Sequence, residues 1–326
     1  MCTAISYKDK FFGRNLDLEF ELPFSKLIVV PKKYLIKEKV SNEILEIKYD
    51  LIGIGMAIDN YPLYYDAMNE KGLFMAGLNF EGYAKYFSIN PKKKNICPFE
   101  FVLYILGKCK DVNEVKEQLK DINLVDINFS DNIKNTPLHW MVTDKTSSIV
   151  IESTKKGIKI YDNFYGVLTN NPEFSYHLEN MNNYINLSPN IKRPLFSDQL
   201  SIISNGLSTT GLPGGLSSID RFVRVAYTKL TSISLDNEID NVNQFFHILN
   251  SVNQVKGTVI GHEKRYELTI YSNCYSLDTL TCYYKTYTNN RINALCLKDI
   301  DTNNLNQLLT FDLDQKQDIN YLKPNK

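Results

Sequence analysis

Met1-Cys2-Thr3-Ala4-Ile5-Ser6-Tyr7 opens the chain and decides its fold. Cys is small enough for methionine aminopeptidase to remove the Met before it, and the mature chain would then begin at Cys2. Free thiols and α-amines both titrate near neutrality, with ordinary pKa values of about 8.5 and about 7.7–8.0. An N-terminal amine that activates its own side chain is a known form of nucleophilic catalysis. The alternative is an ordinary second residue in a frayed terminus.

The next stretch, Phe11-Phe12-Gly13-Arg14-Asn15-Leu16-Asp17, is expected to form a second strand after a turn at Asp9-Lys10. A two-residue hairpin loop would place Cys2 opposite Asp17, where the carboxylate could hold the α-ammonium. Arg14 would then lie on the other face, because side chains alternate along a strand. Arg14 could reach the thiol, and raise its thiolate fraction, only across a bend or bulge. Without Cys2, Arg14 and Asp17 would be interpreted as a surface ion pair.

Length and charge exclude several classes of protein. The 326 residues suffice for one large domain or two small ones, and no linker or repeat interrupts them, so we expect a single domain, residues 1–326. The net charge is zero, which argues against a nucleic-acid or anionic-membrane partner. No leader precedes Cys2, and the longest apolar stretches, such as 51–58, are too short to span a bilayer. These features predict a cytoplasmic protein.

Cysteine and histidine spacings argue against disulfides and metal sites. The six cysteines are scattered without a CxxC pair, which is typical of reduced thiols in a cytosolic protein. The four histidines show no metal-ligand spacing, so we expect no metal site. The cysteines stand at positions 2, 97, 109, 274, 282 and 296, and the histidines at 139, 177, 247 and 262.

Strand and helix patterns alternate in blocks along the chain, which predicts an α+β fold with sheets and helices in layers. Two polar residues are expected at strand ends. Asn79 closes a buried strand, and Asn170 follows a strand at 165–168 that Pro172 stops. Such places often carry functional groups; the alternative is a turn or strand-end cap. Strands are expected within 26–57, 137–168 and 266–297, and helices at 97–109, 111–120, 217–230 and 242–252.

Six motifs together resemble the choloylglycine hydrolases, which are bile salt hydrolases and the related penicillin V acylases. The resemblance runs from residue 2 to about 300. It implies an N-terminal-nucleophile fold, in which two antiparallel sheets lie between helical layers (αββα), together with cofactor-free amide hydrolysis and a homotetramer. The motifs are Cys2-Thr3, Gly13-Arg14-Asn15-Leu16-Asp17, Met68-Asn69-Glu70-Lys71-Gly72-Leu73, Gly77-Leu78-Asn79, Leu168-Thr169-Asn170 and Arg221-Phe222-Val223-Arg224.

The resemblance also implies a role for each matched residue around the nucleophile. Cys2 matches the nucleophile, and its amine is the base that takes the thiol proton and later protonates the leaving amine. Asp17 matches the residue that binds this amine, and Arg14 the residue beside the thiol. Arg221 matches an active-site arginine that helps to hold the charge network.

Two asparagines match the groups that stabilise the tetrahedral oxyanion, namely Asn79 and Asn170. Asn79 also bears on the substrate, because similar penicillin V acylases tend to have Tyr at this position and bile salt hydrolases Asn. By resemblance, the substrate pocket is formed by segments 16–24, 58–65 and 129–138, and an apolar wall suits a steroid. Its wall residues are Leu16, Phe20, Leu22, Ile58, Tyr61, Tyr64, Phe129, Ile133 and Leu138.

The resemblance therefore implies a bile salt hydrolase that cleaves the amide between a bile acid and glycine or taurine through a thioester at Cys2. An acylase of the same fold, acting on penicillin V or acyl-homoserine lactones, is the first alternative. An inactive relative that only binds amphipathic anions is the second, and an unprocessed Met1 would favour it because the amine would be lost as an amide.

Overall fold

Two large antiparallel sheets are stacked face to face in the computed structural model, which describes residues 1–19, 25–191, 197–200 and 204–324. Within these residues the first sheet has six strands, in the order β14 (Val167–Leu168), β1 (Cys2–Tyr7), β2 (Phe11–Leu18), β15 (Leu268–Ser276), β16 (Thr281–Thr286) and β17 (Asn289–Cys296). The second has eight, in the order β13 (Gly157–Asp162), β12 (Ser148–Thr154), β11 (Leu138–Thr143), β8 (Phe74–Asn79), β7 (Tyr61–Asn69), β6 (Leu51–Ile58), β3 (Lys26–Val30) and β18 (Leu309–Asp312).

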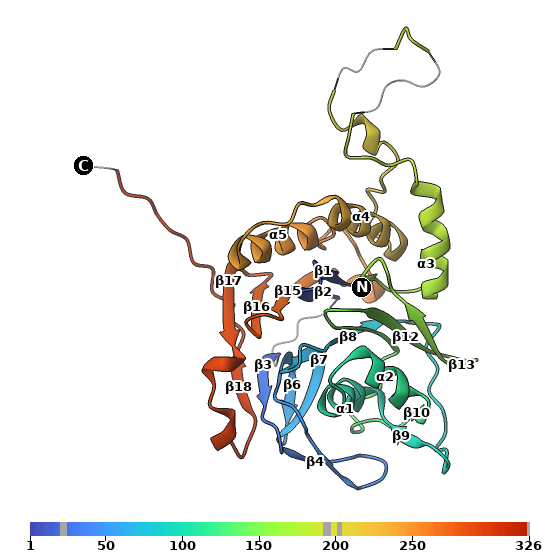
Figure 1. Ribbon diagram of the computed structural model, residues 1–326, viewed down its shortest axis with the longest axis vertical. Helices are drawn as coiled ribbons and strands as arrows, with labels where there is room; N and C mark the ends of the chain where they lie inside the picture. The colour runs from blue at the N-terminus through green and yellow to red at the C-terminus, as the bar shows by residue number, and fades with distance from the viewer. Residues whose placement is uncertain (20–24, 192–196, 201–203, 325–326) are drawn as a thin grey trace.

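Helices cover the outer face of each sheet (Figure 1). α4 (Ser218–Thr231) and α5 (Glu238–Asn250) pack on the six-stranded sheet, whereas α1 (Phe101–Lys108) and α2 (Val112–Leu119) lie on the side of the eight-stranded sheet. This arrangement confirms the expected α+β fold with an αββα order of layers. Besides short 3₁₀ helices, the structure also contains α3 (Phe174–Asn180), the antiparallel pair β4 (Leu35–Lys37) and β5 (Ile44–Glu46), and the parallel pair β9 (Lys94–Ile96) and β10 (Ile122–Leu124).

Two apolar cores hold the layers together. One lies between the two sheets and under α4 and α5, and the other lies between the eight-stranded sheet and α1. Every residue of β1 is buried, because one face of this strand meets the second sheet and the other meets α4. The chain therefore begins inside the sandwich, where Figure 1 places the N-terminus beside β1.

Helix α4 brings polar groups to the edge of this core. Ser217 caps the helix, since its hydroxyl oxygen accepts a hydrogen bond of 3.1 Å from the Asp220 backbone N–H. The buried face of α4 then carries Arg221 next to Phe222 and Val225. The apolar side chains anchor the helix on the sheet, and the arginine reaches the start of β1.

The N-terminal hairpin has a different register from the predicted one. Tyr7 pairs with Phe11 and Cys2 pairs with Leu16, so the prediction that Cys2 lies opposite Asp17 is wrong by one residue. The loop has three residues instead of two, with Lys8 and Asp9 in the left-handed region at φ of 54° and 53°. Three-residue hairpin loops are a common alternative to two-residue ones.

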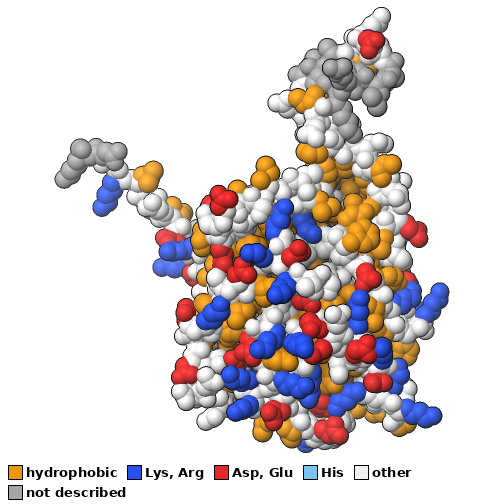
Figure 2. Space-filling view, viewed as in Figure 1, with side chains coloured by type: hydrophobic (Ala, Val, Ile, Leu, Met, Phe, Trp, Pro, Cys, Tyr) orange, Lys and Arg blue, Asp and Glu red, His pale blue; other side chains and the backbone are white. Residues whose placement is uncertain are grey.

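The surface carries charges of both signs, interspersed on the face that Figure 2 shows. This pattern agrees with the zero net charge of the chain. No helix among the described residues is long and apolar enough to cross a membrane.

Candidate active site

Cys2 is the first residue of β1 and is only 2% exposed. Its backbone is held from two directions. The N–H donates a 2.7 Å hydrogen bond to Asn170 Oδ1, and the carbonyl oxygen accepts one of 2.5 Å from Arg221 Nη1. The nitrogen that becomes the α-amine when Met1 is removed thus already faces a polar partner.

Arg14 lies on the same face of the hairpin as Cys2, because the observed register pairs it with Ala4. The prediction that it needs a bend to reach the thiol is therefore wrong. Its fully buried guanidinium crosses to the second sheet, where Nη1 donates to Gly77 O at 2.6 Å. Burial lowers the pKa of Arg14, but the charges of Cys2, Tyr271, Asp66 and Asp17 raise it above its usual value overall. A permanent positive charge accordingly stands near the thiol.

Asp17 lies opposite Met1, whose carbonyl oxygen accepts a 3.0 Å hydrogen bond from the Asp17 N–H. The carboxylate is completely buried, so it is not part of a surface ion pair. Oδ1 accepts a 2.7 Å hydrogen bond from Thr269, while Oδ2 has no hydrogen-bond partner among the described residues and lies 4.0 Å from Arg221 Nη1. Burial raises the pKa of Asp17, although Arg221 and the N-terminal ammonium oppose this rise. An ammonium group at Cys2 would give the free oxygen a partner.

Met1 separates the charged amine from the thiol in the unprocessed chain. Its ammonium donates to Asp17 O at 2.9 Å and forms an ion pair with the buried carboxylate of Glu267. An acidic environment for an amine therefore exists one residue before Cys2. Removing Met1 would leave the Cys2 amine as the positive group beside these acids.

Asn170 and Asn79 meet at the mouth of this cluster. Asn170 Oδ1 accepts from Cys2 N and from Arg221 Nη2, each at 2.7 Å, and this fixes the orientation of the amide. Its Nδ2 donates to Asn79 O at 2.8 Å and has a second hydrogen to offer. Asn79 closes β8 as expected, and its half-buried side chain has no hydrogen bond among the described residues. Neither side chain caps its own strand end.

Arg221 ties the cluster together and is completely buried. Nη1 contacts Cys2 O and Thr3 Oγ1, both at 2.5 Å, and Nη2 contacts Asn170 Oδ1. One guanidinium thus fixes the nucleophile strand and the asparagine that follows β14. Burial lowers the pKa of Arg221, and the neighbouring Asp17 and Cys2 charges counteract this effect.

Several predicted wall residues share one edge of the eight-stranded sheet. β6 ends at Ile58, β7 begins at Tyr61, β8 ends at Asn79 and β11 begins at Leu138, and pairing brings these ends together. The Tyr61 and Phe129 rings lie 5.5 Å apart.

The other wall residues are placed differently. Leu16 and Tyr64 are buried in the two cores, and the Tyr64 hydroxyl donates to Ile28 O at 3.3 Å. Ile133 is half-buried in the loop before β11. Phe20 and Leu22 lie outside the described residues. The sequence assigned all of these to one wall by resemblance, and their contact with substrate stays a prediction.

Four residues of the site region, three of them buried and Ser218 half-buried, were missed by the sequence analysis. His139, His177 and Ser218 bind the backbone at Thr169 and Asn170, and Glu267 pairs with the terminal ammonium. Their partners lie as far as 48 and 266 positions away in the sequence, so no local spacing marks them. Only the three-dimensional fold brings them to the site.

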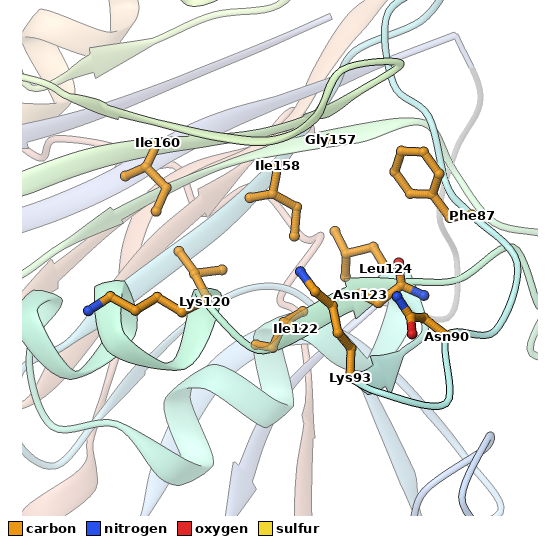
Figure 3. A pocket seen from close by; sticks show the side chains of 11 residues that line it. Phe87, Asn90, Lys93, Lys120, Ile122, Asn123, Leu124, Gly157, Ile158 and Ile160 are labelled. Carbon is orange, nitrogen blue, oxygen red and sulfur yellow. The ribbon is translucent and has the colours of Figure 1, made fainter.

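A separate surface cavity of about 470 Å³ lies between α2, β10 and β13 (Figure 3). Its lining includes Lys93, Lys120, Ile158 and Ile160, and none of the residues around Cys2. This cavity is therefore not the space above the nucleophile. Among the described residues, no three His, Cys, Asp or Glu side chains cluster as metal ligands would.

The chain is similar to known amide hydrolases along most of its length. Residues 2–311 match the family described as linear amide C–N hydrolases, choloylglycine hydrolase family. The chain is 49% identical over 313 residues to a bile salt hydrolase/transferase of Lactiplantibacillus plantarum, covering 94% of this chain and 95% of the relative. It is 40% identical to a bile salt hydrolase/transferase of Clostridium perfringens, over 99% of this chain and 100% of the relative.

Solved structures support the fold. A crystal structure of a conjugated bile acid hydrolase from Clostridium perfringens superposes with a TM-score of 0.91 at 37% identity, over 99% of this chain and 100% of that chain. A penicillin V acylase from Agrobacterium tumefaciens gives a TM-score of 0.76 at 15% identity, over 95% and 90% of the two chains. The second similarity concerns the fold alone, and both agree with the N-terminal-nucleophile fold that the motifs imply.

Proposed function

Because the chain belongs to the choloylglycine hydrolase family of linear amide C–N hydrolases, we propose that it hydrolyses the amide bond of glycine- or taurine-conjugated bile salts. The observation that carries this proposal is the buried cluster at Cys2, in which Asn170 and Arg221 hold the nucleophile backbone and Arg14 stands near the thiol. The names of the relatives supply the class of substrate.

Acylation begins once Met1 has been removed. The Cys2 α-amine takes the thiol proton, and Sγ forms a bond to the carbonyl carbon of the substrate amide. The oxygen of that carbonyl becomes an oxyanion, which the second Nδ2 hydrogen of Asn170 and a donor at Asn79 stabilise. The C–N bond then breaks, the α-ammonium protonates the leaving nitrogen, and glycine or taurine departs while the bile acid remains as a thioester.

Deacylation uses the same groups in the opposite sense. The α-amine takes a proton from a water molecule, whose oxygen attacks the thioester carbonyl. The C–S bond breaks, and the proton returns to the Cys2 sulfur as the free bile acid leaves. Asp17, with its unpartnered Oδ2, orients the α-ammonium in both steps. Arg14 stabilises the thiolate, and Arg221 holds the charge network.

Substrate recognition is proposed for the strand ends near Asn79. Ile58, Tyr61, Phe129 and Leu138 form the predicted apolar wall there, which would suit a steroid body. Tyr61 and Leu138 pack against the core under α1, whereas Cys2 belongs to the core between the two sheets. The family resemblance adds Leu16, Phe20, Leu22, Tyr64 and Ile133 to the predicted wall, although Leu16 and Tyr64 are buried in the cores and Phe20 and Leu22 lie outside the described residues. Penicillin V and acyl-homoserine lactones are the alternative substrates on the same machinery.

Acyl transfer is a second candidate activity, and it is favoured by the name bile salt hydrolase/transferase that two relatives carry. A thioester at Cys2 can be attacked by an amine instead of water, which reverses the acylation step with a new amino acid. The C–S bond breaks, a C–N bond forms, and the amine proton passes through the Cys2 α-amine to the sulfur.

We further infer a single catalytic domain, residues 1–326, which acts as a homotetramer in the cytoplasm without a cofactor. The family resemblance supports the tetramer, and the six unpaired thiols are consistent with a reducing compartment. Sedimentation velocity of the processed protein should give the mass of four chains. A sharp monomer peak at micromolar concentration would contradict the tetramer.

The test of the proposed function measures amine release from glycine- and taurine-conjugated bile salts and from penicillin V side by side. The processed enzyme should release glycine or taurine at a higher kcat/KM than it cleaves penicillin V. Cys2→Ala should remove both activities and leave the melting temperature nearly unchanged. Faster cleavage of penicillin V would move the enzyme to the acylase branch, and no cleavage at all would favour a binding protein.

A further inference from the structure

The dipeptide Thr169-Asn170 is held by side chains from three other parts of the chain. Asn170 O accepts a 3.0 Å hydrogen bond from His177 Nε2, and Thr169 O one of 3.1 Å from His139 Nε2. The Asn170 N–H donates to Ser218 Oγ at 2.8 Å, and Thr169 Oγ1 donates to Ser218 O at 3.0 Å. Hydrogen bonds thus satisfy the carbonyl oxygens of both residues, the backbone N–H of Asn170 and the hydroxyl of Thr169.

Strand pairing alone does not fix this dipeptide. β14 pairs with β1 only through Leu168 with Ala4 and Val167 with Ile5, and the ladder ends before Thr169. Backbone groups beyond a strand end must find partners elsewhere if they are buried. Thr169 and Asn170 are buried, and His139, His177 and Ser218 take the place of a neighbouring strand.

The two histidines belong to one rigid frame. His139 Nδ1 lies 3.3 Å from Glu152 Oε1, and the same oxygen accepts a 2.8 Å hydrogen bond from the Phe174 N–H, which begins the helix that carries His177. Each imidazole is also stacked on an aromatic ring, His139 on Phe80 with centroids 4.3 Å apart and His177 on Phe222 at 4.7 Å.

Both Nε2 atoms face carbonyl oxygens, so each must carry a hydrogen. His177 does so as a neutral imidazole, because burial lowers its pKa to about 4. Its hydrogen bond to Asn170 O is then constant across neutral pH. The contact between His177 and Asn170 O accordingly acts as a fixed support and not as a switch at these pH values.

We propose that His177, His139 and Ser218 are positioning residues that aim the Asn170 side chain at the reacting carbonyl and at the nucleophile amine. This inference rests on the role proposed for Asn170. Asn170 Oδ1 contacts Cys2 N while Nδ2 lies toward Asn79, so a small rotation of the dipeptide would misalign both ends of the amide. Oxyanion donors act on the transition state, and misplacement should lower kcat and not substrate binding.

The experiment compares His177→Phe with His177→Gln. Phe keeps the ring and its stacking on Phe222 but cannot donate to Asn170 O, whereas the Gln amide can reach the place of Nε2. We expect His177→Phe to lower kcat about tenfold with KM within about twofold, and His177→Gln to recover most of the rate. Asn69→Leu is the matched control, since Asn69 is buried and donates to the carbonyls of Leu106 and Cys109 at 2.9 and 2.8 Å in another layer. It should lower the melting temperature and leave kcat unchanged.

A double-mutant cycle with Asn170→Ala tests whether His177 acts through Asn170. The His177→Phe effect on kcat should disappear when Asn170 is already Ala. Additive losses, or an unchanged kcat in both His177→Phe and Ser218→Ala, would overturn the proposal. Ser218→Ala removes the acceptor for Asn170 N–H and replaces His177→Phe in the cycle if that variant does not fold.

The outcomes also separate this inference from the proposed function. The cycle is run on whichever of a conjugated bile salt and penicillin V the unaltered enzyme cleaves, so a wrong substrate class leaves it intact. A fully active Asn170→Ala would refute the oxyanion role itself. An impaired Asn170→Ala with an unimpaired His177→Phe and Ser218→Ala would refute only the positioning role.

Discussion

Cys2 and the pair Cys274 and Cys282 are buried to nearly the same extent but sit in different surroundings. Cys2 is 2% exposed, and Cys274 and Cys282 are 0% exposed in the middle of the same sheet, on β15 and β16. Burial raises the pKa of Cys274 and Cys282 well above the usual value. Near Cys2, by contrast, two arginines are close enough to interact with its charge, which raises the pKa of Arg14 and partly offsets the lowering of the Arg221 pKa by burial.

The contrast shows that depth alone does not make a thiol inert. Removal from water disfavours the thiolate, and only fixed positive charges or hydrogen-bond donors can compensate. The charged groups that act on Cys274 in the middle of the sheet are Cys282 and Glu238, and no arginine is among them within the described residues. The end of the sheet offers Cys2 two guanidinium groups and, after processing, its own amine.

Retaining Met1 should have the largest effect, because it converts the Cys2 amine into an amide that can neither accept nor return a proton. General acid–base groups contribute on the order of 10²–10⁴ in rate, so we expect kcat to fall about 10³-fold. Two fusion proteins cleaved either before Met1 or directly before Cys2 provide matched preparations. Intact mass identifies each terminus, and equal activity of the two would refute the self-base mechanism.

Asn170→Ala should have the next largest effect, since it removes one donor while the thiol stays buried. Loss of a single oxyanion donor typically costs about 10²–10³ in rate, and we expect kcat to fall by about 10² with a smaller change in KM. Asn79→Ala should cost less, because the substitution leaves the backbone N–H of residue 79 in place. Steady-state kinetics checks both, with thermal melts to confirm folding. An active Asn170→Ala would remove this residue from the oxyanion site.

From the sequence, the layers of the fold and the residues that surround Cys2 could be predicted better than the geometry in which these residues meet. Five residues from motifs that resemble the family do meet in space, as the resemblance predicted: Cys2, Arg14, Asp17, Asn170 and Arg221. Periodicity and caps located the main helices, as at Ser217.

The hairpin register could not be predicted from composition. Lys8 and Asp9 both adopt positive φ, which neither residue type favours strongly, and one added loop residue moved Arg14 to the face of Cys2. The supports of Asn170 were also hidden, because His139 and Ser218 approach it from distant positions. Such contacts follow from sheet packing and not from any local pattern.

The smallest predicted effect concerns stability and extends the comparison to another buried group. His177 is completely buried, and desolvation lowers its pKa from 6.5 to about 4, with His139 and Arg221 adding to the decrease and the Asn170 carbonyl opposing it. As the pH falls below about 6.5, unfolded chains take up a proton at this histidine, whereas folded chains do not until about pH 4. Folding stability should therefore be constant above pH 6.5 and decrease between about 6.5 and 4, by about 3 kcal/mol from this group.

Urea unfolding at pH 7, 6, 5 and 4.5 measures this loss, and His177→Gln is the control because glutamine does not titrate. Carboxylates contribute equally to both proteins, so the difference between the two pH profiles isolates the histidine. Measured from its value at pH 7, the difference in unfolding free energy between the two proteins should grow as the pH falls. Near neutral pH the two profiles should run parallel, because the imidazole is uncharged in both the folded and the unfolded state. Parallel profiles throughout would contradict the prediction. They would mean that a negative charge near His177 offsets the cost of burying its imidazolium, as the arginines near Cys2 are proposed to offset the cost of burying a thiolate.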